Sequence, residues 1–322
     1  MIVAEGLTKF YGDRPAIQDL SFRIGQGEVI GLLGLNGAGK STALRILSCL
    51  LLPTSGRVTI EGADVVTHGH QIRKRVGYLP ETPPLYPEMT VRGYLTFVAR
   101  LKGLSAKEAE GRVPEVEKSM HVDDVSRDPI STLSLGYRQR VGLAQAIVHN
   151  PALLILDEPI LGLDPVQIVD MRERIKALRG AHTILVSSHI LPEISQTVDR
   201  ILVLHEGRIV AEGTEQELSK RFAGDHSVLV EVRASEAELR TVVEKVAGVS
   251  VRWVRVGDVQ GMGGPYRGEG ILEACLQSER DAREGLARAF VESGLGLRGL
   301  RPAEVELESI FVQLTKSKEV AA

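Results

Sequence analysis

The amino-acid sequence predicts an α/β fold with a central parallel sheet, built around a phosphate-binding loop. The first observation is a short apolar run at 28–33, followed by the glycine-rich loop 34–42 and a helix-patterned segment that ends at Leu47. The second is the apolar run 152–156, which ends in two carboxylates, and the third is the apolar run 183–188. Strands that are apolar on both faces belong to the middle of a parallel sheet, and ligands bind beyond their carboxyl ends.

Length and composition limit the class of protein. With 322 residues, 43% of them apolar, the chain is expected to form roughly two domains with real cores. Its net charge of -3 gives no general attraction to nucleic acid or anionic lipid. Cys49 and Cys275 are too few for a disulfide framework or a zinc site and are expected to be buried, in a reducing compartment.

The sequence shows neither a secretory signal nor a membrane span. An acid at position 5 and the lack of a long apolar core argue against a signal at residues 1–9. No window approaches 18 uninterrupted apolar residues. If the protein acts at a membrane, another chain is expected to span it.

The glycine-rich loop fits the pattern Gly-x-x-x-x-Gly-Lys-[Ser/Thr]. Its glycines let the backbone bring successive N–H groups against an anion, at the positive end of a helix dipole. Lys40 can reach terminal phosphates, and Ser41 offers an oxygen to Mg²⁺. The alternative is a glycine turn with a surface lysine, which the flanking strand and helix disfavour.

The segments around this loop read as strands. Residues 2–7 and 16–24 are separated by a turn at 11–15, and further strands are expected at 57–62 and 76–79. Tyr11 lies at a loop tip, where its ring could stack on a purine or pack on its own hairpin; position alone leaves both open.

A mostly helical stretch follows at 89–150. Four prolines exclude helix from the loop 80–87, which contains Glu81, and helices are expected at 94–101 and 106–122. Ser134 is expected to cap a helix that runs to Ile147. His68-Gly69-His70 reads as a solvated loop, because no partner shows metal-site spacing.

Two carboxylates and a histidine follow the buried strands. Asp157 suits Mg²⁺ coordination, and Glu158 suits positioning of a water molecule; the alternative is an acidic strand-to-loop turn. His189 lies just past the strand 183–188, on the edge of the sheet that carries ligands. A helix from Asp164-Pro165 to about Leu178 and a hairpin at 200–213 complete this part.

Taken together, these motifs resemble the nucleotide-binding domain of the ATP-binding cassette (ABC) transporter family, over about residues 2 to 220. The resemblance implies a P-loop ATPase at 1–221 with an antiparallel β subdomain and a helical subdomain at about 89–150. It implies Glu158, His189 and Lys40 as catalytic residues, with Ser41, Glu81 and Asp157 around Mg²⁺. The residues that would bind ATP are Tyr11, Gly34, Leu35, Asn36, Gly37, Ala38, Gly39, Lys40, Ser41, Thr42, Ser134, Gly136 and Asp164.

The same resemblance implies a partner and a mechanism. Two copies, or two paralogous subunits, would face each other head to tail, each ATP lying between the phosphate loop of one and the signature Leu133–Tyr137 of the other. Asp164 would lie in the loop that links the two sites. Several residues depart from the usual family pattern: Glu81 replaces a glutamine, Leu135 a glycine, Tyr137 a glutamine, and Ile160 and Leu161 small polar residues. The variants look like the gliding-motility-type branch, whose ATPases serve ABC-2 type permeases.

The last hundred residues read as a second domain, 222–322. Strands at 227–233, 249–256 and 271–276, helices at 235–246 and 282–292, and a strand near 297–300 give the order of a ferredoxin-like α+β fold. A loop at 261–270 and a closing helix at 307–315 are also expected. No catalytic constellation occurs here, so a role in regulation or dimerisation and a merely stabilising role remain alternatives.

The predicted function is the ATPase subunit of an ABC exporter, cytoplasmic and attached to the inner face of the membrane through a separate permease, with no nucleic-acid partner. One alternative is a soluble ABC-type ATPase that acts on nucleic acid or ribosomes. Another is an ATP-dependent regulator that hydrolyses poorly, which Glu81, Leu135 and Tyr137 suggest.

Overall fold

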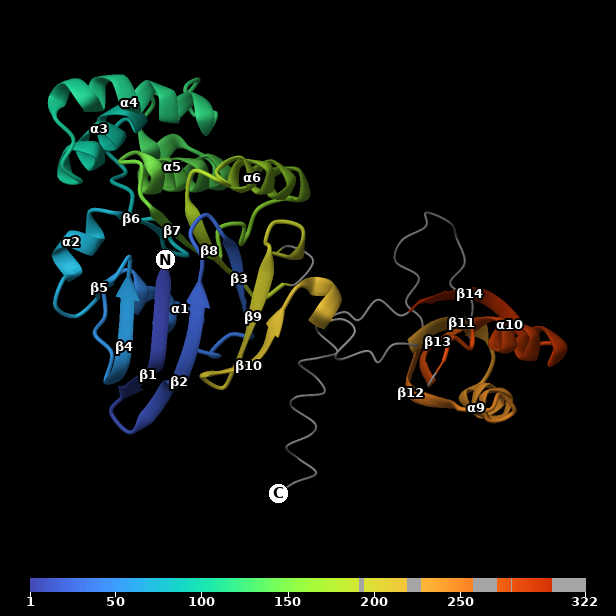
Figure 1. The fold of residues 1–322 in the computed structure, drawn as a ribbon. Coiled ribbons are helices and arrows are strands. Elements are labelled where there is room, and N and C mark those ends of the chain that lie inside the picture. The colour runs from blue at the N-terminus through green and yellow to red at the C-terminus, as the bar shows by residue number, and fades with distance from the viewer. Residues whose placement is uncertain (191–193, 219–226, 257–270, 279, 303–322) are drawn as a thin grey trace. The chain divides into compact units, whose positions relative to one another are not determined.

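The computed structural model describes residues 1–190, 194–218, 227–256, 271–278 and 280–302 (Figure 1). The chain divides into two compact units, Met1–Thr214 and Glu215–Ala322. The predicted loop 261–270 and the predicted helix 307–315 lie outside the described residues.

An antiparallel sheet opens the first unit. Its four strands, in the spatial order β2-β1-β4-β5, are β1 (Ile2–Tyr11), β2 (Arg14–Ile24), β4 (Ser55–Ile60) and β5 (Ala63–Asp64). The first two strands are longer than predicted. β4 ends two residues before the predicted boundary because Glu61 and Gly62 have φ angles of 50° and 80°, which turn the chain into β5.

A six-stranded sheet forms the centre of the first unit, in the order β10-β9-β3-β8-β7-β6. Its strands are β3 (Val29–Leu33), β6 (Val76–Leu79), β7 (Leu153–Asp157), β8 (Thr183–Ser188), β9 (Arg200–His205) and β10 (Arg208–Gly213). All neighbouring pairs are parallel except β9 and β10. Every residue of β3, β7 and β8 is buried, as their continuous apolar pattern predicts.

Helices surround these sheets. They are α1 (Lys40–Leu47), α2 (Gly69–Arg73), α3 (Val91–Leu101), α4 (Ala106–Ser119), the 3₁₀ turn η1 (Ile130–Thr132), α5 (Leu135–Ile147) and α6 (Pro165–Ala177). The apolar side of α1 shares one core with both sheets, through Leu44, Ile46 and Leu47. Figure 1 shows α3, α4, α5 and α6 gathered at one end of the unit.

Three predictions of local structure are wrong. His68–His70 is not a loop: His68 precedes the short helix α2, which continues to Arg73. The helix predicted to reach residue 122 ends at Ser119, because His121 has a φ of 47°. Cys275 is buried as expected, but Cys49 is only half-buried and also has a positive φ, of 56°.

Helix α5 packs without clearance on β6 and the loop after it. A Cβ atom added to Gly142 would lie 2.7 Å from Leu79 Cδ1 and 2.9 Å from Pro83 Cγ. The amide of Gln145 donates to the carbonyl of Tyr78 at 2.8 Å. These contacts fix the helix that carries Ser134 against the loop that carries Glu81.

The second unit has the element order that the sequence predicts. It contains β11 (Ser227–Arg233), α9 (Glu236–Glu244), β12 (Val249–Val256), β13 (Ile271–Ser278), α10 (Arg283–Glu292) and β14 (Gly296–Pro302). The sheet order is β12-β13-β11-β14 and all neighbouring pairs are antiparallel. Leu239 of α9 and Phe290 of α10 share one core with the strands. The assignment to the ferredoxin-like fold stays a prediction.

A half-buried histidine, His149, gives the first unit a pH-dependent stability. His149 lies near Lys102, and its Nε2 is 3.2 Å from the carbonyl oxygen of Val76. Burial, and secondarily the Lys102 charge, lower the pKa of His149 from 6.5 to about 4. In the unfolded chain the imidazole is protonated near pH 6.5, whereas in the folded chain it is protonated only near pH 4. The free energy of unfolding therefore decreases as the pH falls through this window.

When the pH is lowered from 6.5 to 4, we expect the urea concentration at the unfolding midpoint to fall less for a His149→Gln variant than for the wild type. The glutamine amide can still donate to the carbonyl of Val76. His70→Gln, at an exposed histidine, is the matched control and should follow the wild type. A His149→Gln variant with the wild-type pH dependence would contradict this account.

Candidate functional site

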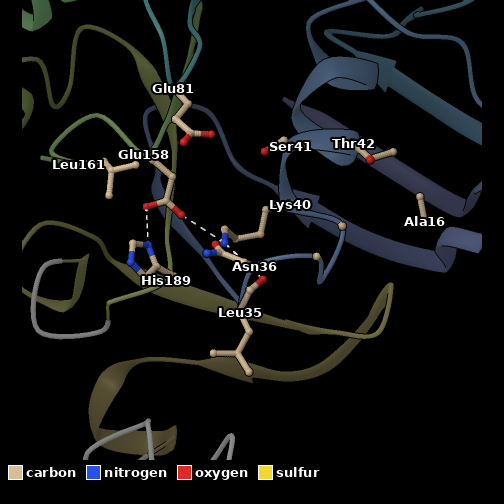
Figure 2. Close-up of a pocket in the computed structure, with 12 residues that line it drawn as sticks. Ala16, Leu35, Asn36, Lys40, Ser41, Thr42, Glu81, Glu158, Leu161 and His189 are labelled. Atoms are coloured by element: carbon tan, nitrogen blue, oxygen red, sulfur yellow. Dashed lines mark hydrogen bonds and ion pairs between the residues drawn. The ribbon is translucent and has the colours of Figure 1, made fainter.

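A cavity of about 430 Å³ lies at the carboxyl edge of the six-stranded sheet (Figure 2). It is formed by the glycine-rich loop, the start of α1, and residues that follow β6, β7 and β8. Its lining consists of Ala16, Leu35, Asn36, Gly37, Gly39, Lys40, Ser41, Thr42, Glu81, Glu158, Leu161 and His189. Eleven of these twelve are residues that the sequence marks as site residues or as departures from the family pattern; the twelfth, Ala16, belongs to β2.

The backbone of the loop requires glycine at defined positions. Gly37 and Gly39 have φ angles of 82° and 105°, which other residues adopt only with strain. A Cβ atom on Gly39 would also lie 2.5 Å from the carbonyl oxygen of Ala16, and one on Gly34 would lie 2.6 Å from that of Leu204. The loop is therefore held against β2 and β9 with no room for a side chain at Gly34 or Gly39.

Lys40 places a buried ammonium group in the cavity. Its Nζ donates to the carbonyl of Gly34 at 2.6 Å and lies 3.2 Å from Oε1 of Glu158. The side chain is only 6% exposed. A buried charge needs partners, and both partners here lie where a phosphate group would compete for the ammonium.

Glu158 stands between Lys40 and His189. Its second oxygen, Oε2, lies 2.9 Å from Nδ1 of His189. The backbone of Glu158 has a φ of 49°, the left-handed conformation that is uncommon outside glycine and often occurs at functional sites. Figure 2 shows the carboxylate linked to the lysine on one side and to the histidine on the other.

Ser187, which the sequence analysis did not single out, holds both carboxylates in place. Its hydroxyl donates to Oδ1 of Asp157 at 2.7 Å and accepts from the backbone N–H of Glu158 at 2.9 Å. Ser187 is fully buried at the end of β8, beside the end of β7. Its only sequence signal was its place on the predicted strand 183–188, two residues before His189.

The oxygens around the cavity suit a divalent cation bound together with phosphate. Ser41 and Glu81 line the cavity, and Asp157 lies at the buried end of β7. Hydroxyl and carboxylate oxygens are the ligands of Mg²⁺, which binds to proteins through few side chains plus substrate phosphates. Among the described residues, no group of three or more His, Cys, Asp or Glu could hold a metal ion alone.

Several predicted site residues lie outside this cavity. Tyr11 ends β1, 49% exposed, with Nζ of Lys9 5.6 Å from its ring centroid. Ser134 and Asp164 cap α5 and α6 by accepting from the N–H groups of Tyr137 and Gln167. The structure thus does not bring Ser134, Gly136 or Asp164 to the phosphate loop of their own chain.

No helix in the part of the chain that the structure describes is long and apolar enough to cross a membrane.

Comparison with protein families and curated proteins places this geometry in context. The family model described as "ABC transporter" matches residues 17–161. The daunorubicin resistance ATP-binding protein DrrA3 of Streptomyces coeruleorubidus is 33% identical, over 98% of this chain and 95% of its own. The bacitracin transport ATP-binding protein BcrA of Bacillus licheniformis is 34% identical, over 98% of this chain and 97% of its own.

Solved structures match about two thirds of the chain. The ATP-binding subunit of an ABC transporter is 33% identical with a TM-score of 0.63, over 69% of this chain and 93% of its own. A dimeric post-hydrolysis state of the ATP-binding cassette MJ0796, bound to ADP and Pi, is 26% identical with a TM-score of 0.62, over 66% of this chain and 98% of its own. The α/β prediction for the first unit is thereby confirmed, with its antiparallel and parallel sheets.

Proposed function

Because this chain belongs to the ABC transporter family, as one of its ATP-binding and ATP-hydrolysing subunits, we propose that two copies of it close head to tail on two ATP molecules. The phosphate loop, Lys40 and the residues of the cavity hold each ATP on one side. Ser134 and Gly136 of the second copy close the other side, since the N-terminus of α5 offers free N–H groups to an anion. Tyr11 stacks on adenine, and Asp164 joins the two sites.

The arrangement of Glu158 carries the hydrolytic part of this proposal. Its carboxylate lies at the cavity, 3.2 Å from the Lys40 ammonium and 2.9 Å from His189. When the γ-phosphate binds the Lys40 ammonium, the Glu158 carboxylate becomes free to orient a water molecule. It accepts a proton from that water as the water attacks phosphorus. His189 then contacts the γ-phosphate and keeps the carboxylate in place.

The metal ion is part of the same proposal. Ser41, Asp157 and Glu81 would hold Mg²⁺, which neutralises charge on the phosphates when bound. Glu81 supplies a carboxylate where the family usually has an amide, and a carboxylate would attract the cation more strongly than an amide would. Loss of the γ-phosphate after hydrolysis removes the group that the two copies share, and the dimer opens.

The names of the relatives support an export role. DrrA3 is named for daunorubicin resistance and BcrA for bacitracin transport, and both match this chain over nearly its full length. We propose that this chain drives a separate ABC-2 type permease, which spans the membrane and selects the cargo. The chain would then lie on the inner face of the membrane, bound to that permease.

The concentration dependence of hydrolysis tests the proposal. If each site needs a second copy, the specific activity of the purified chain with Mg-ATP should rise with protein concentration. It should also rise cooperatively with ATP. A specific activity that stays constant on dilution, down to concentrations at which the chain is monomeric, would contradict a shared site.

A further inference from the structure

Two parts of the chain that the proposed function assigns to the contact with a second copy also contact each other. One is the signature turn, defined here as Ser134–Tyr137 at the start of α5. The other is the Asp164 loop, defined here as residues 161–167 up to the first turn of α6. Figure 1 shows α5 and α6 next to each other. One set of contacts joins these parts directly, and two further sets connect Tyr137 through Arg140 to α6.

The first contacts involve the backbone glycines of both parts. A Cβ atom added to Gly162 would lie 3.2 Å from Cδ2 of Leu135, so the leucine side chain covers that glycine. A Cβ atom added to Gly136 would lie 2.5 Å from Oε1 of Gln167. The N–H of Gln167 in turn donates to the carboxylate of Asp164 at 3.0 Å. Each part therefore packs directly on the other.

Tyr137 makes the second set of contacts. Its hydroxyl donates to Oδ2 of Asp124 at 2.6 Å, and this bond raises the pKa of the tyrosine. The guanidinium carbon of Arg140 lies 5.1 Å from the centroid of its ring, within the range of a cation–π interaction. The tyrosine thus holds Arg140 on the side of α5 that faces α6.

The third set continues from Arg140 to α6. Arg140 pairs with Oδ2 of Asp170 at 3.0 Å, and the same carboxylate accepts two bonds from Arg174. Arg174, 6% exposed, also donates to the carbonyl of Ser119 at 3.1 Å. A continuous chain of contacts therefore runs from Asp124 through Tyr137 and Arg140 to the body of α6.

We propose that Tyr137 and Leu135 are positioning residues, which fix the signature turn onto the Asp164 loop so that both meet a second copy as one rigid surface. This inference rests on the proposed function. It also gives a role to the two signature positions that depart from the usual glycine and glutamine. Small errors in placement weaken contacts to a reacting phosphate, so a signature turn that moves independently should close less effectively on ATP.

Tyr137→Phe tests the proposal, because it removes the bond to Asp124 but keeps the ring beside Arg140. The measurement is the ATP concentration at which half of the protein becomes dimeric in sedimentation, in a Glu158→Gln background that preserves ATP. We expect this concentration to rise about three- to tenfold, as for the loss of one exposed hydrogen bond to a carboxylate. ADP binding to a single copy should stay unchanged.

Three further variants separate positioning from general damage. Asp124→Ala should have the same effect, and the double variant Tyr137→Phe/Asp124→Ala should be no worse than either single change. Tyr86→Phe, at an exposed tyrosine whose ring contacts phenylalanine retains, is the control and should dimerise like the parent. Effects that add in the double variant would overturn the proposal.

The outcomes distinguish this inference from the proposed function. If Glu158→Gln alone fails to dimerise with ATP, the proposed function fails. If it dimerises and Tyr137→Phe in that background needs no more ATP, the positioning role fails while the proposed function stands. A shift that is accompanied by an equal loss of ADP binding would also overturn the positioning role.

Discussion

The Glu158→Gln variant should hydrolyse ATP about 10²- to 10⁴-fold more slowly than the wild type, the usual contribution of a positioned general base. Glutamine has nearly the same shape, so the fold and the bond toward His189 are kept. It has no negative charge and cannot accept a proton from water. ATP binding should therefore persist, and an ATP-bound dimer should accumulate because the step that opens it is blocked.

Turnover of [γ-³²P]ATP and sedimentation in the same buffer measure both effects. Glu88→Gln, at an exposed glutamate, is the matched control. It should retain wild-type turnover and should not accumulate an ATP-bound dimer. Undiminished turnover by Glu158→Gln would show that another group orients the water.

The Lys40→Met variant should lose both ATP binding and turnover. Methionine fills the volume of the side chain but removes the ammonium that bonds to Gly34 and pairs with Glu158. Loss of a charged hydrogen bond to phosphate weakens binding by roughly 10- to 100-fold. The carboxylate of Glu158, no longer neutralised, also repels the triphosphate.

Nucleotide affinity is measured by equilibrium binding of a fluorescent ATP analogue. Lys74→Met, at an exposed lysine, is the control and should bind like the wild type. If Lys40→Met bound ATP with wild-type affinity, the triphosphate would not lie where the loop predicts.

Local patterns in the sequence predict those features of the site that depend on residues within a single segment. The glycine loop, the apolar strands with polar residues at their carboxyl ends, and the caps at Ser134 and Asp164 all follow from neighbouring residues. The structure places Lys40, Glu158 and His189 together because β3, β7 and β8 are adjacent and parallel.

Contacts between distant segments could not be predicted in this way. Ser187 acts by bonding to residues 29 and 30 positions away, and Ala16 reaches the cavity only because β2 passes beside the loop. The ion pair between Arg140 and Asp170 joins residues of two different helices, which no periodic pattern along the chain predicts. The left-handed backbone conformation of Glu158 could not be predicted either, because two neighbouring carboxylate residues carry no signal for it.

Complementation between two inactive variants tests the shared site most directly. Lys40→Met damages the phosphate-loop side, and Ser134→Arg blocks the signature side. In a head-to-tail dimer of one variant with the other, one site carries both defects and the other carries none. Mixing the two purified proteins should therefore restore Mg-ATP hydrolysis that neither shows alone. If the mixture stays as inactive as its components while each variant still folds and the mixed dimer forms, the site does not lie between two copies.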